Sequence, residues 1–142
     1  MFGEILSEIR KFFRHNKGQE TFRKARGSAG ETFAAKFLQK QGMKILLRNW
    51  RHGNDEIDIV ALDGKCLVFT EVKTRSDKDV HGGYAAVDAR KRNAQRRAIR
   101  EYLHQIKGAA QEWRFDVVAV TVRESDGAMS ATHIRQVSLR KP

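Results

Sequence analysis

Two carboxylates and a lysine between Asn54 and Arg75 have the types and spacing for metal-assisted chemistry. Asp58, Glu71 and Lys73 form the pattern D-x12-E-x-K. Carboxylates on two neighbouring strands can ligate one hard cation, and Mg²⁺ typically binds one or two of them while it keeps several waters. An ammonium group beside such a site can orient or deprotonate a bound water, or neutralise charge that develops on a phosphate. A salt-bridged surface cluster is the alternative, because charged strands often produce this spacing.

The element that positions these groups is a predicted β-hairpin with its turn at residues 63–64. An Asp-Gly pair between alternating apolar runs is a strong hairpin signal, because a type I′ turn requires positive φ at both central residues. A two-residue turn at this point places Asp58 opposite Phe69 and Glu56 opposite Glu71. Like charges directly opposite each other destabilise a sheet, so this pairing calls for a cation. Glu56 is therefore a candidate auxiliary residue of the site.

One face of this hairpin is predicted to be apolar near the turn and charged at its far end. Side chains alternate between the two faces of a strand, so every second residue shares a face. The residues predicted on this face are Glu56, Asp58, Val60, Leu62, Leu67, Phe69, Glu71 and Lys73.

The charge balance favours a polyanionic partner. The 142 residues include 28 Lys and Arg against 17 Asp and Glu, which gives a formal net charge of +11. This profile is typical of nucleic-acid binders and, less often, of proteins on anionic membranes. Loose binding of polyanions by an ordinary basic protein is the alternative.

Other features of the composition narrow the class of protein. The length is that of one domain with a substantial core. Cys66 is the single cysteine, which excludes an internal disulfide and a cysteine-based zinc site and favours a buried structural thiol. No apolar run approaches the roughly 18 residues of a membrane span, and the N-terminus lacks the pattern of a signal peptide. We expect a cytoplasmic protein with no integral membrane association.

An amphipathic helix is predicted from Met1 to about His15, because its apolar residues recur at helical spacing. A basic arm follows as far as Arg26. Docking of the helix on protein is favoured over docking on a membrane, because the cations lie mostly after the helix. Its phenylalanines make a homodimer a candidate assembly. We divide the chain into this helix and arm, residues 1–26, and an α/β domain, residues 27–142.

A capping box, S-A-G-E at residues 28–31, predicts a helix that begins at Ser28 and ends at Gly42. In such a box the glutamate reaches back to the backbone N–H of the cap. The local pattern therefore gives Glu31 a complete structural role. The segment from Met43 to Trp50 is predicted to be a strand, and residues 51–54 a turn or loop.

A long basic helix is predicted from about Ala85 to Ile106, after a polar, glycine-rich loop at residues 76–83. Its inner stripe is apolar and consists of Val87, Ala94, Ala98, Ile99, Tyr102, Leu103 and Ile106. Its outer face lacks the alternating charge signs of an ordinary solvated helix, which favours an anionic partner. The candidate nucleic-acid-binding residues are Arg75, Arg90, Lys91, Arg92, Arg96, Arg97 and Arg100.

Two more strands complete the predicted fold. The Val-rich run from Arg114 to Arg123 is typical of a central strand, and residues 131–139 alternate like a strand with one solvated face. Helices and strands in this order predict one α/β domain in which helices flank a mixed central sheet, with the amphipathic helix as an N-terminal addition.

Several segments in combination resemble the bacterial YraN family. They are Gly30-Glu31, Asn49, residues 56–61, Asp63-Gly64, residues 67–69, residues 71–75, Ala86-Val87, Lys91, Ala98, Tyr102-Leu103 and residues 114–118. The likeness extends from about Arg26 to Val122. That family is similar to restriction-endonuclease-like nuclease domains of the PD-(D/E)xK type, close to Holliday junction resolvases. Two departures are Asp55, where the family usually has glycine, and Ile57, where the superfamily motif has proline.

The resemblance implies a restriction-endonuclease-like fold and a role for each site residue. Glu31, Asp58, Glu71 and Lys73 would be catalytic, with Asp58, Glu71 and the Val72 carbonyl as metal ligands. The implied cofactor is Mg²⁺, with Mn²⁺ as a substitute and no small-molecule cofactor. The implied function is hydrolysis of phosphodiester bonds in DNA, with branched or structured DNA as a candidate substrate. The alternative is a non-catalytic nucleic-acid-binding or assembly protein on a nuclease-like scaffold.

Overall fold

The computed structural model describes residues 25–78, 89–110 and 112–140. The predicted helix at residues 1–15, the basic arm to residue 24, and residues 79–88 lie outside the described residues. The described elements are α2 (Ala25–Lys40), β1 (Lys44–His52), β2 (Asp55–Asp63), β3 (Cys66–Ser76), α3 (Ala89–Gln105), β4 (Glu112–Val122) and β5 (Met129–Ile134).

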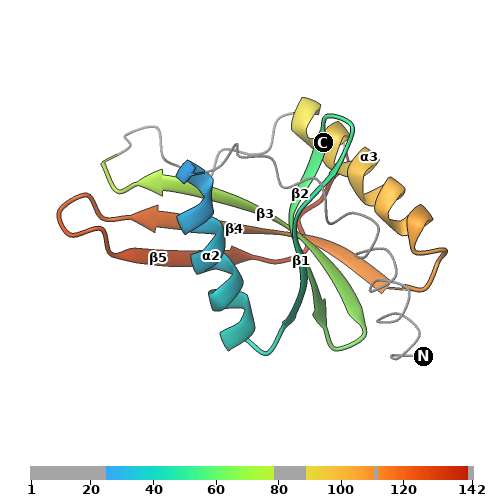
Figure 1. The fold of residues 1–142 in the computed structure, drawn as a ribbon, viewed down its shortest axis with the longest axis horizontal. Helices are drawn as coiled ribbons and strands as arrows, with labels where there is room; N and C mark the ends of the chain where they lie inside the picture. The colour runs from blue at the N-terminus through green and yellow to red at the C-terminus, as the bar shows by residue number, and fades with distance from the viewer. Residues whose placement is uncertain (1–24, 79–88, 111, 141–142) are drawn as a thin grey trace.

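The five strands form one mixed sheet in the order β1-β2-β3-β4-β5 (Figure 1). Neighbouring strands are antiparallel except for β3 and β4, which are parallel. A parallel pair needs a long crossover connection, and α3 lies within that connection. The prediction of an α/β domain with a mixed sheet and flanking helices is confirmed, and the finer assignment to the restriction-endonuclease-like fold stays a prediction.

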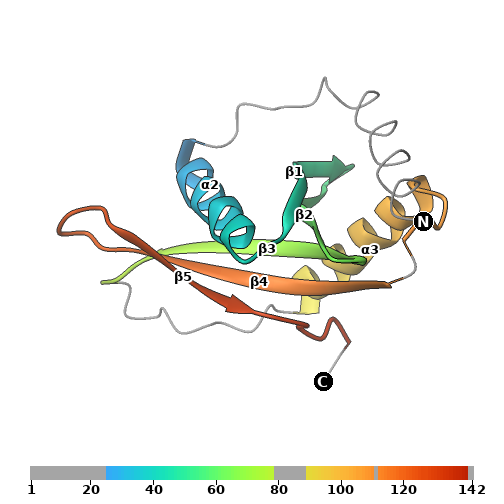
Figure 2. The same ribbon diagram turned by 90° about the horizontal axis from the view of Figure 1, so that it is seen from below.

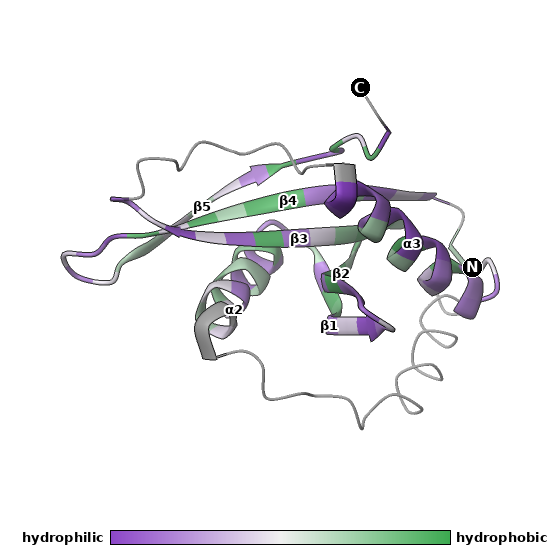
Figure 3. Cartoon of the chain, turned by 90° about the horizontal axis from the view of Figure 1, so that it is seen from above, coloured by the Kyte–Doolittle hydropathy of each residue, from purple (hydrophilic) through white to green (hydrophobic). Residues whose placement is uncertain are grey.

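The sheet has a hydrophobic core on each face, and among the described elements α2 covers one core and α3 the other. Figure 2 shows α2 on one side of β3 and β4, and Figure 3 shows apolar β3 and β4 segments beside a largely polar α3. The core under α3 includes Val60, Leu62, Leu67, Phe69, Ala98, Ile99, Tyr102 and Phe115. The core under α2 includes Ala34, Leu38, Ile59, Ala61, Val68, Val118 and Val120. The predicted inner stripe of α3 is thus confirmed for its described residues, with Ala94 and Leu103 half-buried.

The predicted helix start at Ser28 is wrong, because α2 already begins at Ala25. Alanine and arginine at positions 25 and 26 are favourable helix residues, and residues 25–27 extend the helix by most of a turn. Ser28 then lies inside the helix, where it cannot act as its N-cap. The predicted end is confirmed: Gly42 has φ +92° and its N–H donates to the Gln39 carbonyl. The Met43 N–H donates to the Leu38 carbonyl, which completes a Schellman motif.

The hairpin exists, but its predicted register is wrong. Asp63 pairs with Cys66 and Val60 with Phe69, so the two turn residues are Gly64 and Lys65. Gly64 has φ +60° at the first of the two turn positions, where a type II′ turn requires glycine. Glu56 is therefore not opposite Glu71. The pairing moves by two positions, so residues in the regular part of the hairpin keep their predicted faces, because the side-chain period is also two.

Two other strand boundaries differ from the prediction. β1 continues to His52, so residues 51 and 52 are not part of a loop. β5 ends at Ile134 rather than at residue 139, because Gln136 adopts φ +53° and its N–H donates to an Asp116 side-chain oxygen. β4 is an interior strand, as expected from its valines, and the central position of the sheet belongs to β3.

A buried ionic network joins β4 to β5. Asp116 is fully buried; it binds Arg114 Nε at 3.1 Å and His133 Nε2 at 2.7 Å. Arg114 also binds Asp63 at 2.9 Å, and His133 Nδ1 lies 2.9 Å from the Gln41 side-chain oxygen. The network compensates a charge that would be costly to bury alone. This network was not predicted from the sequence.

Two expectations from the composition concern the burial of Cys66 and membrane-spanning segments. Cys66 is half-buried, its Sγ lies 3.8 Å from the Leu67 carbonyl oxygen, and burial raises the pKa of its thiol. This environment fits the structural thiol that was expected, although the burial is incomplete. Within the described ranges, neither α2 nor α3 has the length and apolar character needed to cross a membrane.

Candidate active site

The strands β2 and β3 separate at the predicted site residues. Their ladder runs from Asp63 and Cys66 to Ile59 and Thr70. Beyond this point β2 continues beside β1, and β3 continues beside β4. At the start of this fork the Val72 N–H donates a 2.8 Å hydrogen bond to Asp58 Oδ2. A carboxylate from β2 thus takes the place of a backbone partner for β3.

The bend in β2 also changes the face on which Asp58 lies. Ile57 and Val60 both pack in the core under α3, although they are three residues apart. Strict alternation would place them on opposite faces. Asp58 lies at this irregularity and is directed to the side of Glu31, so the prediction that it shares the Val60 face is wrong.

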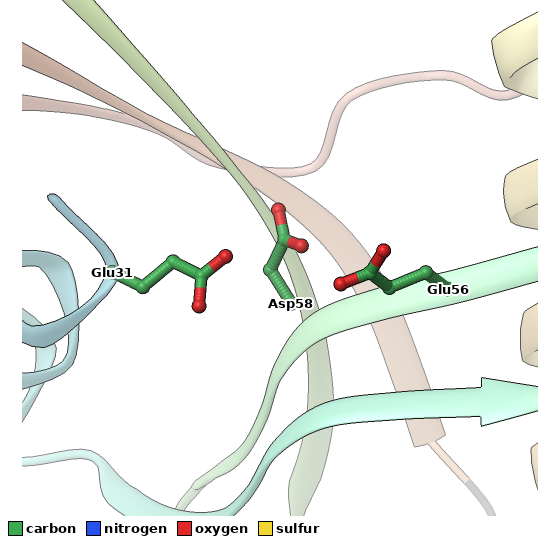
Figure 4. A group of neighbouring side chains, drawn as sticks. All are labelled: Glu31, Glu56 and Asp58. Carbon is green, nitrogen blue, oxygen red and sulfur yellow. The ribbon is translucent and has the colours of Figure 1, made fainter. Parts of the chain in front are cut away.

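Three carboxylates meet where α2 passes the fork. Oxygens of Glu31, Glu56 and Asp58 all lie within 4.8 Å of one another. Figure 4 shows Asp58 between the other two side chains, with Glu31 entering from α2. Glu31 is only 6% exposed and Asp58 only 9% exposed. Such a group of oxygen donors is suited to a hard cation.

Close packing of α2 on β3 brings Glu31 to this position. Gly30 is buried, and a Cβ atom added to it would lie 2.0 Å from Thr74 Oγ1. Any larger residue would therefore push α2 away from β3. The glycine before Glu31, rather than a helix cap, explains how this glutamate reaches Asp58.

Arginines lie beside the two outer carboxylates of this group. Arg51 binds Glu56 at 3.0 Å, and Arg48 Nη2 lies 3.9 Å from Glu31. Arg48 also donates to Thr32 Oγ1 at 3.1 Å. These cations reduce the repulsion among the carboxylates. Such pairs are what a salt-bridged cluster, the alternative to a metal site, would contain. Asp58, in the centre, accepts a hydrogen bond from the neutral Val72 N–H.

Glu71 approaches the fork from the side of α3. Gln95 on α3 donates a 2.6 Å hydrogen bond to Glu71 Oε2. Burial raises the pKa of Glu71, while the charges of Lys91 and Lys73 and hydrogen bonds with Gln95 and Asp58 act in the opposite direction. The predicted ligand pair and the predicted lysine are therefore neighbours.

Sequence reasoning missed Gln95, which is buried although it is polar. Its position was detectable, because Gln95, Ala98, Ile99 and Tyr102 recur at the i, i+3, i+4 and i+7 spacing of one buried face. A polar residue on such a face needs a partner. What the sequence could not supply was the identity of that partner.

The predicted basic residues of α3 differ in their exposure. Arg90, Lys91, Arg97 and Arg100 are exposed, and Arg92 and Arg96 are half-buried. Lys91 lies near Glu71, and Arg97 binds Asp55 through Nε at 3.1 Å and Nη2 at 3.0 Å. Arg96 donates to Asn93. Arg75 is half-buried near the end of β3. The fork thus has cations on its α3 side, and Asp55 holds one of them in place.

The comparisons with known proteins concern mainly this region. Residues 30–120 match the uncharacterised protein family UPF0102. A UPF0102 protein of Paenarthrobacter aurescens is 47% identical over 94 residues, which are 66% of this chain and 78% of the relative. A UPF0102 protein of Beutenbergia cavernae is 40% identical over 111 residues, which are 78% of this chain and 93% of the relative.

The matched segment contains Glu31, the β2–β3 fork and α3. It excludes the N-terminal arm and β5. These matches agree with the family resemblance inferred from the sequence, and they carry no assignment of activity. The chain belongs to the uncharacterised protein family UPF0102.

Proposed function

We propose that this protein is a metal-dependent phosphodiesterase that hydrolyses DNA. The observation that supports the proposal best is the strand fork at Asp58 and Glu71. There, Asp58 of β2 accepts a hydrogen bond from the Val72 N–H of β3, and burial raises the pKa of Glu71, the residue before Val72. Burial and mutual repulsion both disfavour the ionised form of neighbouring carboxyl groups. Such an arrangement therefore does not stabilise the fold, which favours a functional role for it.

The donor set of the fork fits Mg²⁺ or Mn²⁺. Asp58, Glu71 and the Val72 carbonyl supply oxygen ligands, which hard divalent cations prefer. Burial raises the pKa of Glu71, and the neighbouring Asp58 acts on it in the opposite direction. Both carboxyl groups would hold the cation in their ionised form. Glu31 lies near Asp58 and would act directly or through a water, while Glu56 would be an auxiliary residue.

The cation would supply Lewis-acid activation of a water and of the scissile phosphate. Residues of the chain would orient the reacting groups and accept the proton. Lys73, whose charge acts on Glu71, would orient the attacking water or receive its proton. Gln95 would hold the Glu71 carboxylate in one orientation through its 2.6 Å hydrogen bond. Positioning of this kind reduces the cost of reaching the transition state.

The basic residues would hold the DNA backbone beside this site. Lys91 lies near Glu71, and Arg90, Arg97 and Arg100 are exposed on the same helix. Phosphate contacts fix the position of a duplex but do not read its sequence. We therefore propose recognition of DNA shape, with branched or structured DNA as the candidate substrate.

The test compares purified wild type with Asp58→Asn and Lys73→Ala on branched and linear DNA, with Mg²⁺ or Mn²⁺. We expect both variants to lose at least about 100-fold in cleavage rate and to retain DNA binding. Arg123→Gln is the matched control, because Arg123 pairs with Asp126 after β4; its cleavage rate should be that of wild type. Wild type that binds DNA but cleaves none of these substrates would sink the proposal and favour a non-catalytic DNA-binding protein.

A further inference from the structure

An open pocket lies beside the fork, between the β1–β2 turn and α3. Its volume is about 500 Å³, within the range of small-ligand sites. Its lining includes His52, Asn54, Asp55, Arg97, Arg100 and Glu101. Asp55 precedes Asp58 by three residues on β2, a span of about 10 Å at roughly 3.3 Å per residue. The pocket is therefore within about two nucleotides of the proposed active site.

Two arginines give the pocket an anion-binding side. Asp55 fixes the guanidinium of Arg97 through Nε and Nη2, so Nη1 lies on the other side of the planar group. The Arg97 side chain is nevertheless 61% exposed. Arg100 is exposed and follows three residues later on α3, a spacing that places two side chains on one helix face. Two guanidinium groups in this arrangement suit a phosphate.

An aromatic pair gives the pocket a stacking surface. The His52 and Trp50 rings are stacked, with centroids 6.3 Å apart and an interplanar angle of 12°. Trp50 is buried and so fixes the orientation of the histidine ring. The His52 side chain is 56% exposed, and its Nε2 lies 3.7 Å from a Glu101 oxygen. An aromatic ring that is fixed on one side and exposed on another is a platform for a nucleobase.

We propose that this pocket binds one unpaired nucleotide of a DNA substrate. Its phosphate contacts Arg97 and Arg100, its base stacks on His52, and the exposed Asn54 amide offers a donor and an acceptor to the base edge. A base inside a duplex cannot make these contacts, because its neighbours cover both of its faces. This proposal rests on the proposed function, because it takes DNA as the ligand. An unpaired nucleotide held in the pocket would be the physical reason for a preference for structured DNA.

The experiment measures equilibrium binding by fluorescence anisotropy, with the full chain and a metal chelator so that no cleavage is needed. Three labelled duplexes of equal length serve as probes. One is fully paired, one carries a single unpaired nucleotide, and one carries an abasic sugar at that unpaired position. Wild type is expected to bind the unpaired base about tenfold more tightly than the abasic site.

Substitutions in the pocket separate stacking from charge. His52→Ala should bind the unpaired-base and abasic probes equally, and His52→Phe should restore the preference. Arg100→Gln should weaken binding to both and leave their ratio near that of wild type. Arg123→Gln, outside the pocket, should match wild type on every probe.

The outcomes distinguish this proposal from the proposed nuclease function. Equal wild-type affinity for the unpaired base and the abasic site overturns the pocket, even if the protein cleaves DNA. The same result follows if His52→Ala keeps the full preference. A protein that shows the base preference but cleaves no substrate supports the pocket and refutes the phosphodiesterase. Absence of all DNA binding overturns both proposals.

Discussion

The environment of Glu71 in the proposed site should make the free energy of unfolding depend on pH, which can be measured without substrate. Burial raises its pKa above the ordinary glutamate value. The folded protein therefore keeps a proton at pH values where the unfolded chain has lost it. The folded state then binds more protons, and the free energy of unfolding falls as pH rises. The decrease begins near the ordinary glutamate value and ends above the raised pKa.

Glu71→Gln should remove this pH dependence, because glutamine is neutral throughout the window. We expect the free energy of unfolding of metal-free wild type to fall relative to that of the variant as pH rises through the raised pKa. Denaturant titrations in chelator at a series of pH values measure this difference. Parallel pH profiles for the two proteins would contradict the assignment of the raised pKa to Glu71.

Asp116 shows how a buried charge outside the site depends on its partners. It is fully buried and binds Arg114 and His133. His133→Ala should lower the free energy of unfolding by about 2 kcal/mol, because it removes a hydrogen-bond partner of the buried Asp116 carboxylate. Arg135→Ala is the matched control, since Arg135 makes an exposed 3.4 Å ion pair with Asp63; its cost should stay below about 1 kcal/mol. Equal costs for both variants would refute the buried-pair explanation.

At the scale of elements, the contact between α2 and β3 decides where Glu31 lies. Gly30→Ala adds a Cβ 2.0 Å from Thr74 Oγ1. We expect a loss of about 2 kcal/mol in the free energy of unfolding, since overpacking strains both elements. Thr74→Ala in the same chain removes Oγ1 and Cγ2 and should restore part of the loss. A double-mutant cycle by chemical denaturation measures this coupling, and additive effects would argue against the contact.

The start of α2 can be tested by a change that touches no other element. A true N-cap serine costs about 1 kcal/mol when replaced by alanine. Ser28 lies within α2 and is exposed, so Ser28→Ala should be neutral or slightly stabilising, as helix propensity requires. Thermal unfolding followed by circular dichroism measures the difference. Destabilisation of cap size would restore the capping box and, with it, a purely structural role for Glu31.

At the scale of the whole molecule, the net charge of +11 should govern DNA binding. If about six phosphates are neutralised, the logarithm of the binding constant falls with the logarithm of salt concentration at a slope near −5. Removing one phosphate contact, as in Arg90→Gln, should make the slope shallower by about one. Arg123→Gln, which removes a charge paired with Asp126, should not change it. A slope near zero would contradict electrostatic DNA binding.

Much of the fold was predictable because the patterns that encode it are local. Alternating and continuous apolar runs predicted every described strand. The apolar stripe of α3 predicted which helix face is buried, and Gly42 predicted where α2 ends. The same local patterns selected Asp58, Glu71 and Lys73 by residue type and by position on two adjacent strands, although the predicted face of Asp58 is wrong.

The predicted hairpin register, the predicted start of α2 and the predicted end of β5 are wrong where a local sequence signal is compatible with more than one structure. The Asp63-Gly64 pair predicts a turn, yet the hairpin turns at Gly64 and Lys65 because glycine also favours the first position of a type II′ turn. The S-A-G-E pattern resembles a cap, but the preceding residues continue the helix. β5 stops early because Gln136 donates its N–H to a buried aspartate twenty residues away.

The sequence by itself determined that this is a basic α/β domain with carboxylates and a lysine on adjacent strands. Only the tertiary structure decided that β2 and β3 separate at Asp58, that Glu31 meets Asp58, and that Gln95 holds Glu71. The β1–β2 turn and α3 form their pocket in the same way, from segments far apart in the chain. Such contacts depend on the bend of a strand and on how closely a helix can approach it. At Gly30 that approach is set by the absence of a single side chain opposite Thr74.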